Sequence, residues 1–106
     1  MSPKRGEIYL IKVVYPDQTG WKVRPAVVIS PNEFDGEIDV VAVSVSTALP
    51  RNHFDVVLEN WSEEGLDKPS IARTSKLISV SSFMLKKRLG TLTSDDLTRV
   101  MTRCRE

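Results

Sequence analysis

The chain has 106 residues, of which 15 are Lys or Arg and 14 are Asp or Glu, so its formal net charge at pH 7 is +1. This balance excludes a general positive field, and any binding of nucleic acid must come from local geometry. The single cysteine, Cys104, excludes an internal disulfide and a cysteine-based metal cluster. No apolar run reaches the ~18 residues of a membrane span or forms a leader. We therefore expect one cytoplasmic domain, residues 1–106, without membrane contact.

The first half of the chain predicts three short strands, at residues 7–15, 26–29 and 38–45. Residues 16–22 form a loop by composition, and Trp21 near its end is either a lid over a core edge or a platform for stacking. Asp35 and Gly36 indicate a hairpin turn between the second and third strands. The third strand should turn its more apolar face to the core, with Val41, Val43 and Val45.

Arg24 comes just before Pro25 and the apolar run at 26–29. A residue before proline is biased towards an extended conformation, so the Arg24 side chain should project from the entrance of this strand. Two interpretations stay open at this point: an ordinary surface arginine at a strand end, or a cation placed for function.

The second half continues with short elements. Residues 46–52 form a polar loop. In the strand at 54–58, Phe54, Val56 and Leu58 alternate with Asp55 and Val57, which predicts an inside and an outside. The acidic segment at 60–69 is rich in turn residues. The remaining elements before the C-terminal segment are a strand at 70–78, a helical turn at 81–85 and a short edge strand at 87–92.

One clear helix closes the chain. Thr93 or Ser94 can cap it, and Asp95 and Asp96 lie in the first turn, where they complement the helix dipole. The apolar residues recur with helical spacing and should pack on the sheet: Leu97, Val100, Met101 and Cys104. Several short strands and one terminal helix predict an α+β fold built on a small curled antiparallel sheet or barrel.

The sequence lacks a glycine-rich phosphate loop, a nucleophile elbow and a cluster of metal ligands, so no cofactor is expected. His53 is the only histidine, which excludes a two-histidine ribonuclease site within one chain. What remains is a set of cations and hydroxyls at strand ends: Arg24, Ser46, Thr47, Arg73, Thr74 and Ser75. Arginine can hold two phosphate oxygens, and neighbouring hydroxyls can donate to the others. An RNA phosphate at such a site could be attacked by its own 2′-hydroxyl, with the arginines stabilising the extra charge.

Several motifs in this order resemble the PemK/MazF toxin family, the sequence-specific endoribonucleases of bacterial toxin–antitoxin modules. The motifs are Lys-Arg-Gly-Glu-Ile-Tyr at 4–9, Arg-Pro-Ala-Val-Val-Ile-Ser at 24–30, the hydroxyl pair at 46–47, Phe-Asp-Val-Val-Leu at 54–58 and Leu-Gly-Thr-Leu at 89–92. The resemblance implies an SH3-like barrel with a C-terminal helix. It also implies a homodimer that cuts single-stranded RNA without metal and is neutralised by an antitoxin protein.

The resemblance carries the family's functional arginine onto Arg24 and its functional threonine onto Ser46, with Thr47 as the neighbouring hydroxyl. Some members use an acidic residue where this chain has Arg73 and Thr74, so Arg73 is expected to stabilise the same oxyanion. We thus predict four catalytic residues: Arg24, Ser46, Thr47 and Arg73. The predicted RNA-binding residues are Trp21, Lys22, Arg51, Thr74 and Lys76.

Two other functions stay open. The chain could be a catalytically weak or inactive module of the same shape that holds RNA or an antitoxin, which the replacement of the acidic residue by Arg73 supports. It could also be a poison of DNA gyrase, since CcdB toxins are similar in fold. Such a poison would use the end of the helix, residues 101–106, where no specific signal is present.

Overall fold

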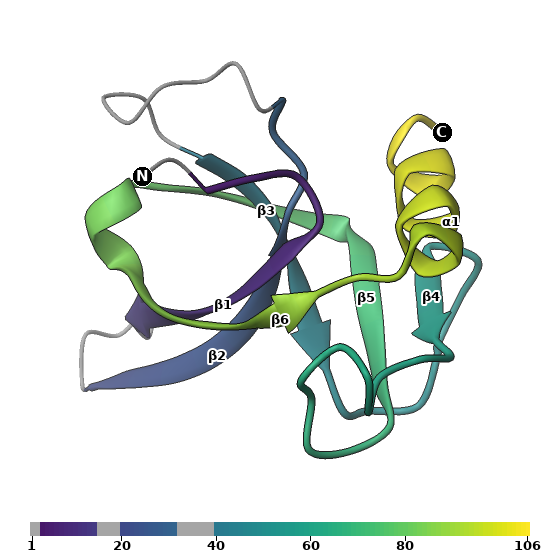
Figure 1. Ribbon diagram of the computed structural model, residues 1–106, viewed down its shortest axis with the longest axis horizontal. Helices are drawn as coiled ribbons and strands as arrows, with labels where there is room; N and C mark the ends of the chain where they lie inside the picture. Colours follow the sequence, from purple (N-terminus) through teal and green to yellow (C-terminus); the bar gives the residue numbers. More distant parts are fainter. Residues whose placement is uncertain (1–2, 15–19, 32–39) are drawn as a thin grey trace.

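A computed structural model describes residues 3–14, 20–31 and 40–106 of the chain (Figure 1). The elements are β1 (Glu7–Val14), β2 (Trp21–Val28), β3 (Val40–Ser46), β4 (Asp55–Leu58), β5 (Ser70–Val80), a short 3-10 helix η1 (Ser82–Met84), β6 (Leu85–Thr91) and α1 (Ser94–Cys104). The strands form one antiparallel sheet in the order β4-β5-β3-β2-β1-β6, with β4 and β6 at its two open edges. The predicted α+β fold is confirmed, with a curled sheet that is not closed into a barrel.

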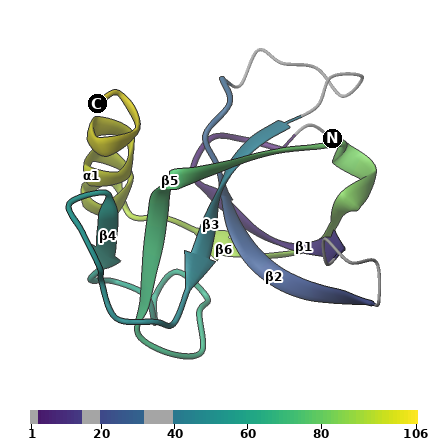
Figure 2. The same cartoon turned by 180° about the vertical axis from the view of Figure 1, so that it is seen from behind.

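The sheet is strongly curled (Figures 1 and 2). Each of its two faces contributes to a cluster of buried apolar residues. Val43 and Val45 of β3 belong to the cluster that includes Val100 of α1. Val40 and Ala42, on the opposite face of β3, belong to a second cluster with Ile11 of β1. The prediction of a single core face on this strand was therefore wrong, because the curl encloses the second face as well. This two-sided burial explains why β1 and β3 carry apolar residues on both faces.

The second strand starts earlier than its sequence predicts. Trp21 and Lys22 belong to β2 and not to a loop, because β2 pairs with β1 from Val27 back to the pair of Val14 and Trp21. Arg24 consequently lies inside the strand, opposite Ile11, and not at the entrance of the strand.

The sheet splits at Pro25. The pairing between β2 and β3 covers only Ala26 to Val28, whereas β3 continues to Ser46 along β5. Proline has no N–H with which to extend the β2–β3 ladder. In the part of the chain that the structure describes, the first half of β2 is thus paired with β1 alone, and an opening separates it from the end of β3.

The other predicted elements are confirmed: a long strand from Ser70, a helical turn before β6, an edge strand at β6 and the terminal helix. Thr93 caps α1, accepting a hydrogen bond from the N–H of Asp96, and Val100 is fully buried against the sheet. The predicted turn at Asp35 and Gly36 lies outside the described residues. None of the described helices is long and apolar enough to cross a membrane.

The loop between β4 and β5 packs directly on β6 through two glycines. Gly65 has φ +90°, and a Cβ on it would lie 2.1 Å from the carbonyl oxygen of Leu89. A Cβ on Gly90 would lie 2.2 Å from the carbonyl oxygen of Glu64. Only glycine permits this backbone contact, which fixes the loop against the edge of the sheet.

Candidate functional site

Strand register brings the predicted cations and hydroxyls of three strands to one face of the sheet. Ser44 of β3 is paired with Arg73 of β5 on one side and with Ala26 of β2 on the other. Residues two apart on a strand point to the same face, so Arg24 lies on the face of Ala26, and Ser46 on that of Ser44. Arg24 and Ser46 therefore stand on either side of the opening at Pro25.

These side chains line one pocket of about 340 Å³. Its polar lining consists of Arg24, Ser44, Ser46, Arg73 and Lys76, and its walls include Ile11, Val13 and Ile78. Among the residues that the structure describes, three cations and two hydroxyls meet here, and no carboxylate lines the pocket. A phosphate group matches this combination, because guanidinium groups bind two of its oxygens in a planar fork and hydroxyls donate to the others. The site is a candidate anion-binding site, which we call the Arg24 pocket.

Arg24 and Arg73 are held differently. Arg24 is exposed, whereas the Arg73 side chain is only 12% exposed and its Nη1 lies 3.4 Å from Oδ2 of Asp55. The same carboxylate oxygen accepts a hydrogen bond from the backbone N–H of Arg51 at 2.9 Å. Asp55 and Arg73 are direct partners across β4 and β5. The Arg73 side chain is thus held in position in the wall of the pocket, whereas the exposed Arg24 side chain can move towards a ligand.

Asp55 was predicted on the outer face of its strand, and this prediction was wrong. The carboxylate is fully buried, and its burial is stabilised by the guanidinium of Arg73 and by the backbone of Arg51. Phe54, predicted to point inwards, is 38% exposed. The alternation of apolar and polar residues did not reveal that Asp55 is buried and Phe54 exposed, because the ion-pair partner of Asp55 lies 18 residues away in the sequence.

Replacing Asp55 by asparagine is expected to lower the free energy of unfolding by about 1–3 kcal/mol, because Arg73 loses a charged hydrogen-bond partner in a largely buried place. Urea denaturation monitored by circular dichroism measures the change. Glu63→Gln, which neutralises an exposed carboxylate, should stay within about 0.5 kcal/mol of the unaltered protein. An equal midpoint for Asp55→Asn and the unaltered chain would mean that the pair does not stabilise the fold.

The remaining predicted residues lie around the Arg24 pocket or away from it. Lys22 is exposed two residues before Arg24, on the same face of β2. Trp21 is 58% exposed, and the Lys12 ammonium lies 4.9 Å from the centroid of its ring. Thr47 is exposed just beyond Ser46 and lines the two neighbouring pockets instead.

Two predicted RNA-binding residues have other contacts. The Thr74 hydroxyl is buried and donates to the carbonyl oxygen of Phe54 at 2.7 Å. Arg51 is exposed outside the pocket, with its Nε 3.9 Å from Asp55. His53 also lies outside the pocket, with Nε2 3.0 Å from the Glu106 carboxylate. The structure thus brings together Arg24, Ser46, Arg73 and Lys76, with Lys22 beside them.

A pair of buried carboxyl groups at the start of α1 was missed by sequence reasoning. Glu64 and Asp96 are both 0% exposed. Burial and the nearby Asp96 carboxyl raise the pKa of Glu64 to about 7. Burial alone would raise the pKa of Asp96, but hydrogen bonds with Glu64, Asn60 and Arg99 bring it below its usual value. In the sequence both residues look like solvated acids of a turn and a first helical turn, so the pattern carries no signal of their pairing.

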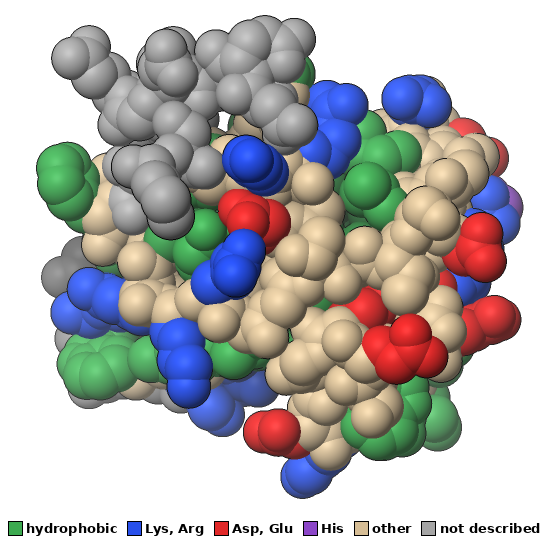
Figure 3. Space-filling view, viewed as in Figure 1, with side chains coloured by type: hydrophobic (Ala, Val, Ile, Leu, Met, Phe, Trp, Pro, Cys, Tyr) green, Lys and Arg blue, Asp and Glu red, His purple; other side chains and the backbone are tan. Residues whose placement is uncertain are grey.

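Charge is unevenly distributed over the molecule despite the small net charge. On the face seen in Figure 3, most acidic side chains lie on the side of α1, and lysines and arginines are the commoner charged residues on the side of β1 and β6. Among the described residues, no three His, Cys, Asp or Glu side chains are grouped so that they could hold a metal ion.

The curled sheet with its terminal helix and the cationic pocket at the split define a small α+β protein with a candidate anion-binding site on the face of its sheet. Comparison with known proteins then gives the family. The chain matches the model of PemK-like, MazF-like toxins of type II toxin–antitoxin systems over residues 4–106, and it belongs to this family.

Solved structures with the same fold agree with this assignment. The MazE-MazF complex (Form-III) from Deinococcus radiodurans matches with a TM-score of 0.81 and 20% identity, covering 98% of this chain and 94% of that chain. An endoribonuclease in complex with its cognate antitoxin from Mycobacterial species matches with a TM-score of 0.80 and 20% identity, covering 97% and 91%. At these identities the likeness shows the fold alone. A search of curated proteins finds no match.

Proposed function

We propose that this chain is the toxin of a type II toxin–antitoxin module and that it cleaves single-stranded RNA at the Arg24 pocket without a metal ion. The observation that carries the proposal is the meeting of Arg24, Ser46 and Arg73 in one pocket, because the family motifs select Arg24 and Ser46, and Arg73 adds a second guanidinium beside them. Membership of the family of PemK-like, MazF-like toxins also supports the proposal that this chain is a toxin. Messenger RNA as the substrate would place the protein in the cytoplasm.

In the proposed reaction, the 2′-oxygen of the RNA forms a bond to the adjacent phosphorus and the bond from phosphorus to the 5′-oxygen breaks. Solvent water takes the proton of the 2′-hydroxyl, and the departing 5′-oxygen receives a proton from solvent water. The products are a 2′,3′-cyclic phosphate and a 5′-hydroxyl. Negative charge on the phosphate oxygens increases as the phosphorane forms, and the guanidinium groups of Arg24 and Arg73 stabilise it more than they stabilise the ground state. The Ser46 hydroxyl donates a hydrogen bond to one of these oxygens.

Neighbouring residues would bind the rest of the RNA strand. Lys22 and Lys76 are exposed beside the pocket and would contact flanking phosphates. The exposed ring of Trp21 offers a face for stacking of a base. Thr47 and Arg51, in the loop after β3, would contact the strand where it leaves the pocket. The buried Thr74 hydroxyl would act indirectly, by holding β5 to Phe54.

We further propose a homodimer and a cognate antitoxin protein as partners. Two Arg24 pockets in a dimer would give a chain of net charge +1 a longer basic surface for RNA. Structures with the same fold include complexes with a cognate antitoxin, which supports a similar partner for this chain. Sedimentation that shows only monomer at micromolar concentration would contradict the dimer.

A second function is favoured by one observation: none of the described residues that line the Arg24 pocket carries an imidazole or a carboxylate. Arginine is a poor proton acceptor, with a pKa above about 12, so proton transfer has no evident carrier among the lining residues. The pocket would then bind RNA or an antitoxin segment without cutting it.

Incubation of the purified protein with a long single-stranded RNA in EDTA distinguishes the two functions. The proposal expects discrete fragments with 5′-hydroxyl ends and cyclic phosphates. Intact RNA that is nevertheless retained by the folded, antitoxin-free protein would support binding without cleavage. Cleavage that stops in EDTA and returns with Mg²⁺ would contradict the metal-independent mechanism.

A further inference from the structure

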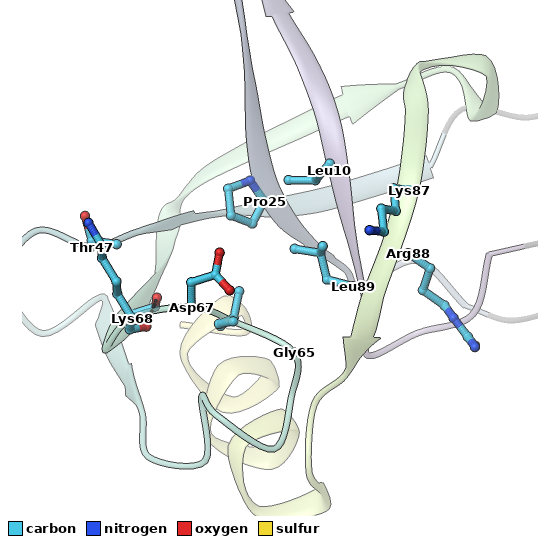
Figure 4. Close-up of a pocket in the computed structure, with 11 residues that line it drawn as sticks. Leu10, Pro25, Thr47, Gly65, Asp67, Lys68, Lys87, Arg88 and Leu89 are labelled. Atoms are coloured by element: carbon cyan, nitrogen blue, oxygen red, sulfur yellow. Dashed lines mark hydrogen bonds between the residues drawn. The ribbon is translucent and has the colours of Figure 1, made fainter.

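A second pocket lies on the other side of the split, between β6 and the loop that precedes β5 (Figure 4). Its volume is about 570 Å³. Leu10, Pro25, Leu66 and Leu89 form apolar walls, and Asp67 and Lys87 contribute charges. Figure 4 shows the Asp67 carboxylate directed towards Pro25, into the space that these walls enclose. We call this the Asp67 pocket.

The two pockets adjoin at the split in the sheet. Pro25 lines both of them. Ser46 lines the Arg24 pocket, and Thr47, the next residue, lines the Asp67 pocket. A strand of RNA with its phosphate at Arg24 therefore has a neighbouring nucleotide within reach of the Asp67 pocket, because adjacent nucleotides are joined by the phosphate itself.

We propose that the Asp67 pocket receives the base next to the cleaved phosphate and that Asp67 selects a base with an exocyclic amino group. The inference rests on the proposed function and adds a determinant of sequence specificity to it. Adenine, cytosine and guanine carry an exocyclic amino group that can donate to a carboxylate. Uracil has no such group, and its one imide N–H lies between two carbonyl oxygens that repel a carboxylate. The apolar walls accept the faces of the base.

The charges at the rim fit a nucleotide. Arg88 is paired with Glu7, with Nη1 and Oε2 2.9 Å apart, and in Figure 4 its side chain is directed away from the pocket. Within the part of the chain that the structure describes, Lys68 and Lys87 form no salt bridge. One carboxylate for the base and two lysines for a flanking phosphate match the two ends of a nucleotide.

The pocket is also rigid on the side of Asp67. Gly65, two residues before it, packs its backbone on Leu89 so closely that a Cβ would lie 2.1 Å from a carbonyl oxygen. This contact fixes the distance between Asp67 and the wall at Leu89. A preformed slot of defined width distinguishes ligands better than a mobile loop, because less conformational freedom is lost on binding.

Binding of short RNAs tests the inference without relying on cleavage. The probes carry a 2′-deoxynucleotide at the cut position, which removes the attacking hydroxyl, and differ only in the base on each side of it. Affinity is measured by fluorescence anisotropy for the unaltered protein, Asp67→Asn and the control Asp95→Asn, which neutralises an exposed carboxylate of α1.

The unaltered protein and Asp95→Asn should bind RNA with uracil at one fixed side of the cut about 10-fold more weakly than RNA with an amino-bearing base. In Asp67→Asn this ratio should fall towards 1, because an amide can both donate to uracil and accept from an amino group. Lys87→Ala should weaken all probes alike, because it would contact phosphate.

An unchanged ratio in Asp67→Asn would overturn the inference while leaving the proposed function intact. A ratio near 1 in the unaltered protein would overturn it as well. Failure of the unaltered protein to bind any probe or to cut any RNA would instead contradict the proposed function, so the two failures are distinguishable.

Discussion

Replacing Arg24 by alanine is expected to lower the rate of RNA cleavage by about 10²–10³-fold, the loss typical when one preorganised donor to a developing oxyanion is removed. Arg24 lines the pocket opposite Ser46 and Arg73, and its exposed guanidinium can approach a phosphate. Its removal would leave Arg73 as the only guanidinium among the described residues that line the pocket. Single-turnover cleavage of a labelled RNA, with the protein in excess, measures the chemical step separately from binding.

Two further variants show whether the fork or merely the charge of Arg24 is required. Arg24→Lys keeps the charge but cannot hold two phosphate oxygens in one plane, so it should recover only a small part of the lost rate. Arg105→Ala removes an exposed arginine at the end of α1 and should cleave at the original rate. Equal rates for Arg24→Ala and Arg105→Ala, with both proteins folded, would remove Arg24 from the proposed mechanism.

The second large effect is expected from Glu64, which ties the loop after β4 to the start of α1. Its Oε2 accepts a hydrogen bond from the N–H of Thr93 at 2.8 Å, whereas its Oε1 is buried without a donor. Asp96 beside it accepts hydrogen bonds from the N–H groups of Glu59 and Asn60 and is paired with Arg99. A proton on Glu64 would supply the missing hydrogen bond to the Asp96 carboxylate.

The pH dependence follows from the direction of the shift. The pKa of Glu64 is raised from 4.5 to about 7 in the folded protein, so between these values the folded state holds a proton that the unfolded chain releases. The free energy of unfolding should therefore fall as pH rises from about 4.5 to 7, by up to about 3 kcal/mol. The lowered pKa of Asp96 acts in another range, since its stabilising contribution is lost only as pH falls below about 3.8.

Glu64→Gln should abolish this dependence. The amide keeps an acceptor for Thr93 and supplies a permanent donor to Asp96, as the protonated acid does. Urea denaturation at pH 5 and pH 8 is the measurement: the variant and the unaltered protein should be equally stable at pH 5, and the variant should be more stable at pH 8. Glu63→Gln, the exposed neighbour, should leave the fall with pH in place. A fall that persists in Glu64→Gln would assign the dependence to other groups.

Strand periodicity, proline and capping residues were sufficient to predict most elements of this fold. The helix from Ser94 was predictable because its cap, its acidic first turn and its apolar stripe are local signals. The start of β2 was not, because Trp21 and Lys22 extend the strand only through pairing with β1. Tertiary pairing of this kind overrides the local composition of a loop.

The candidate site was predictable where the family motifs name its residues, and not where it depends on distant partners. Arg24 and Ser46 lie in recognisable motifs, whereas Arg73 replaces an acidic residue that some members use, and strand register brings the three together. Asp55, Glu64 and Asp96 read as ordinary surface acids in the sequence. Their burial depends on Arg73, Thr93 and one another, which only the folded chain places in contact.

The stop of the β2–β3 ladder at Pro25 gives the molecule a groove that exists before any ligand arrives. If β2 and β3 continued to pair beyond Ala26, the paired strands would cover Arg24 and Ser46. A ligand would then have to break backbone hydrogen bonds between the two strands to reach these side chains. Because Pro25 cannot supply the next N–H, folding itself leaves the groove open. Association then needs no strand separation, and its rate should be limited by diffusion and charge and not by an opening step.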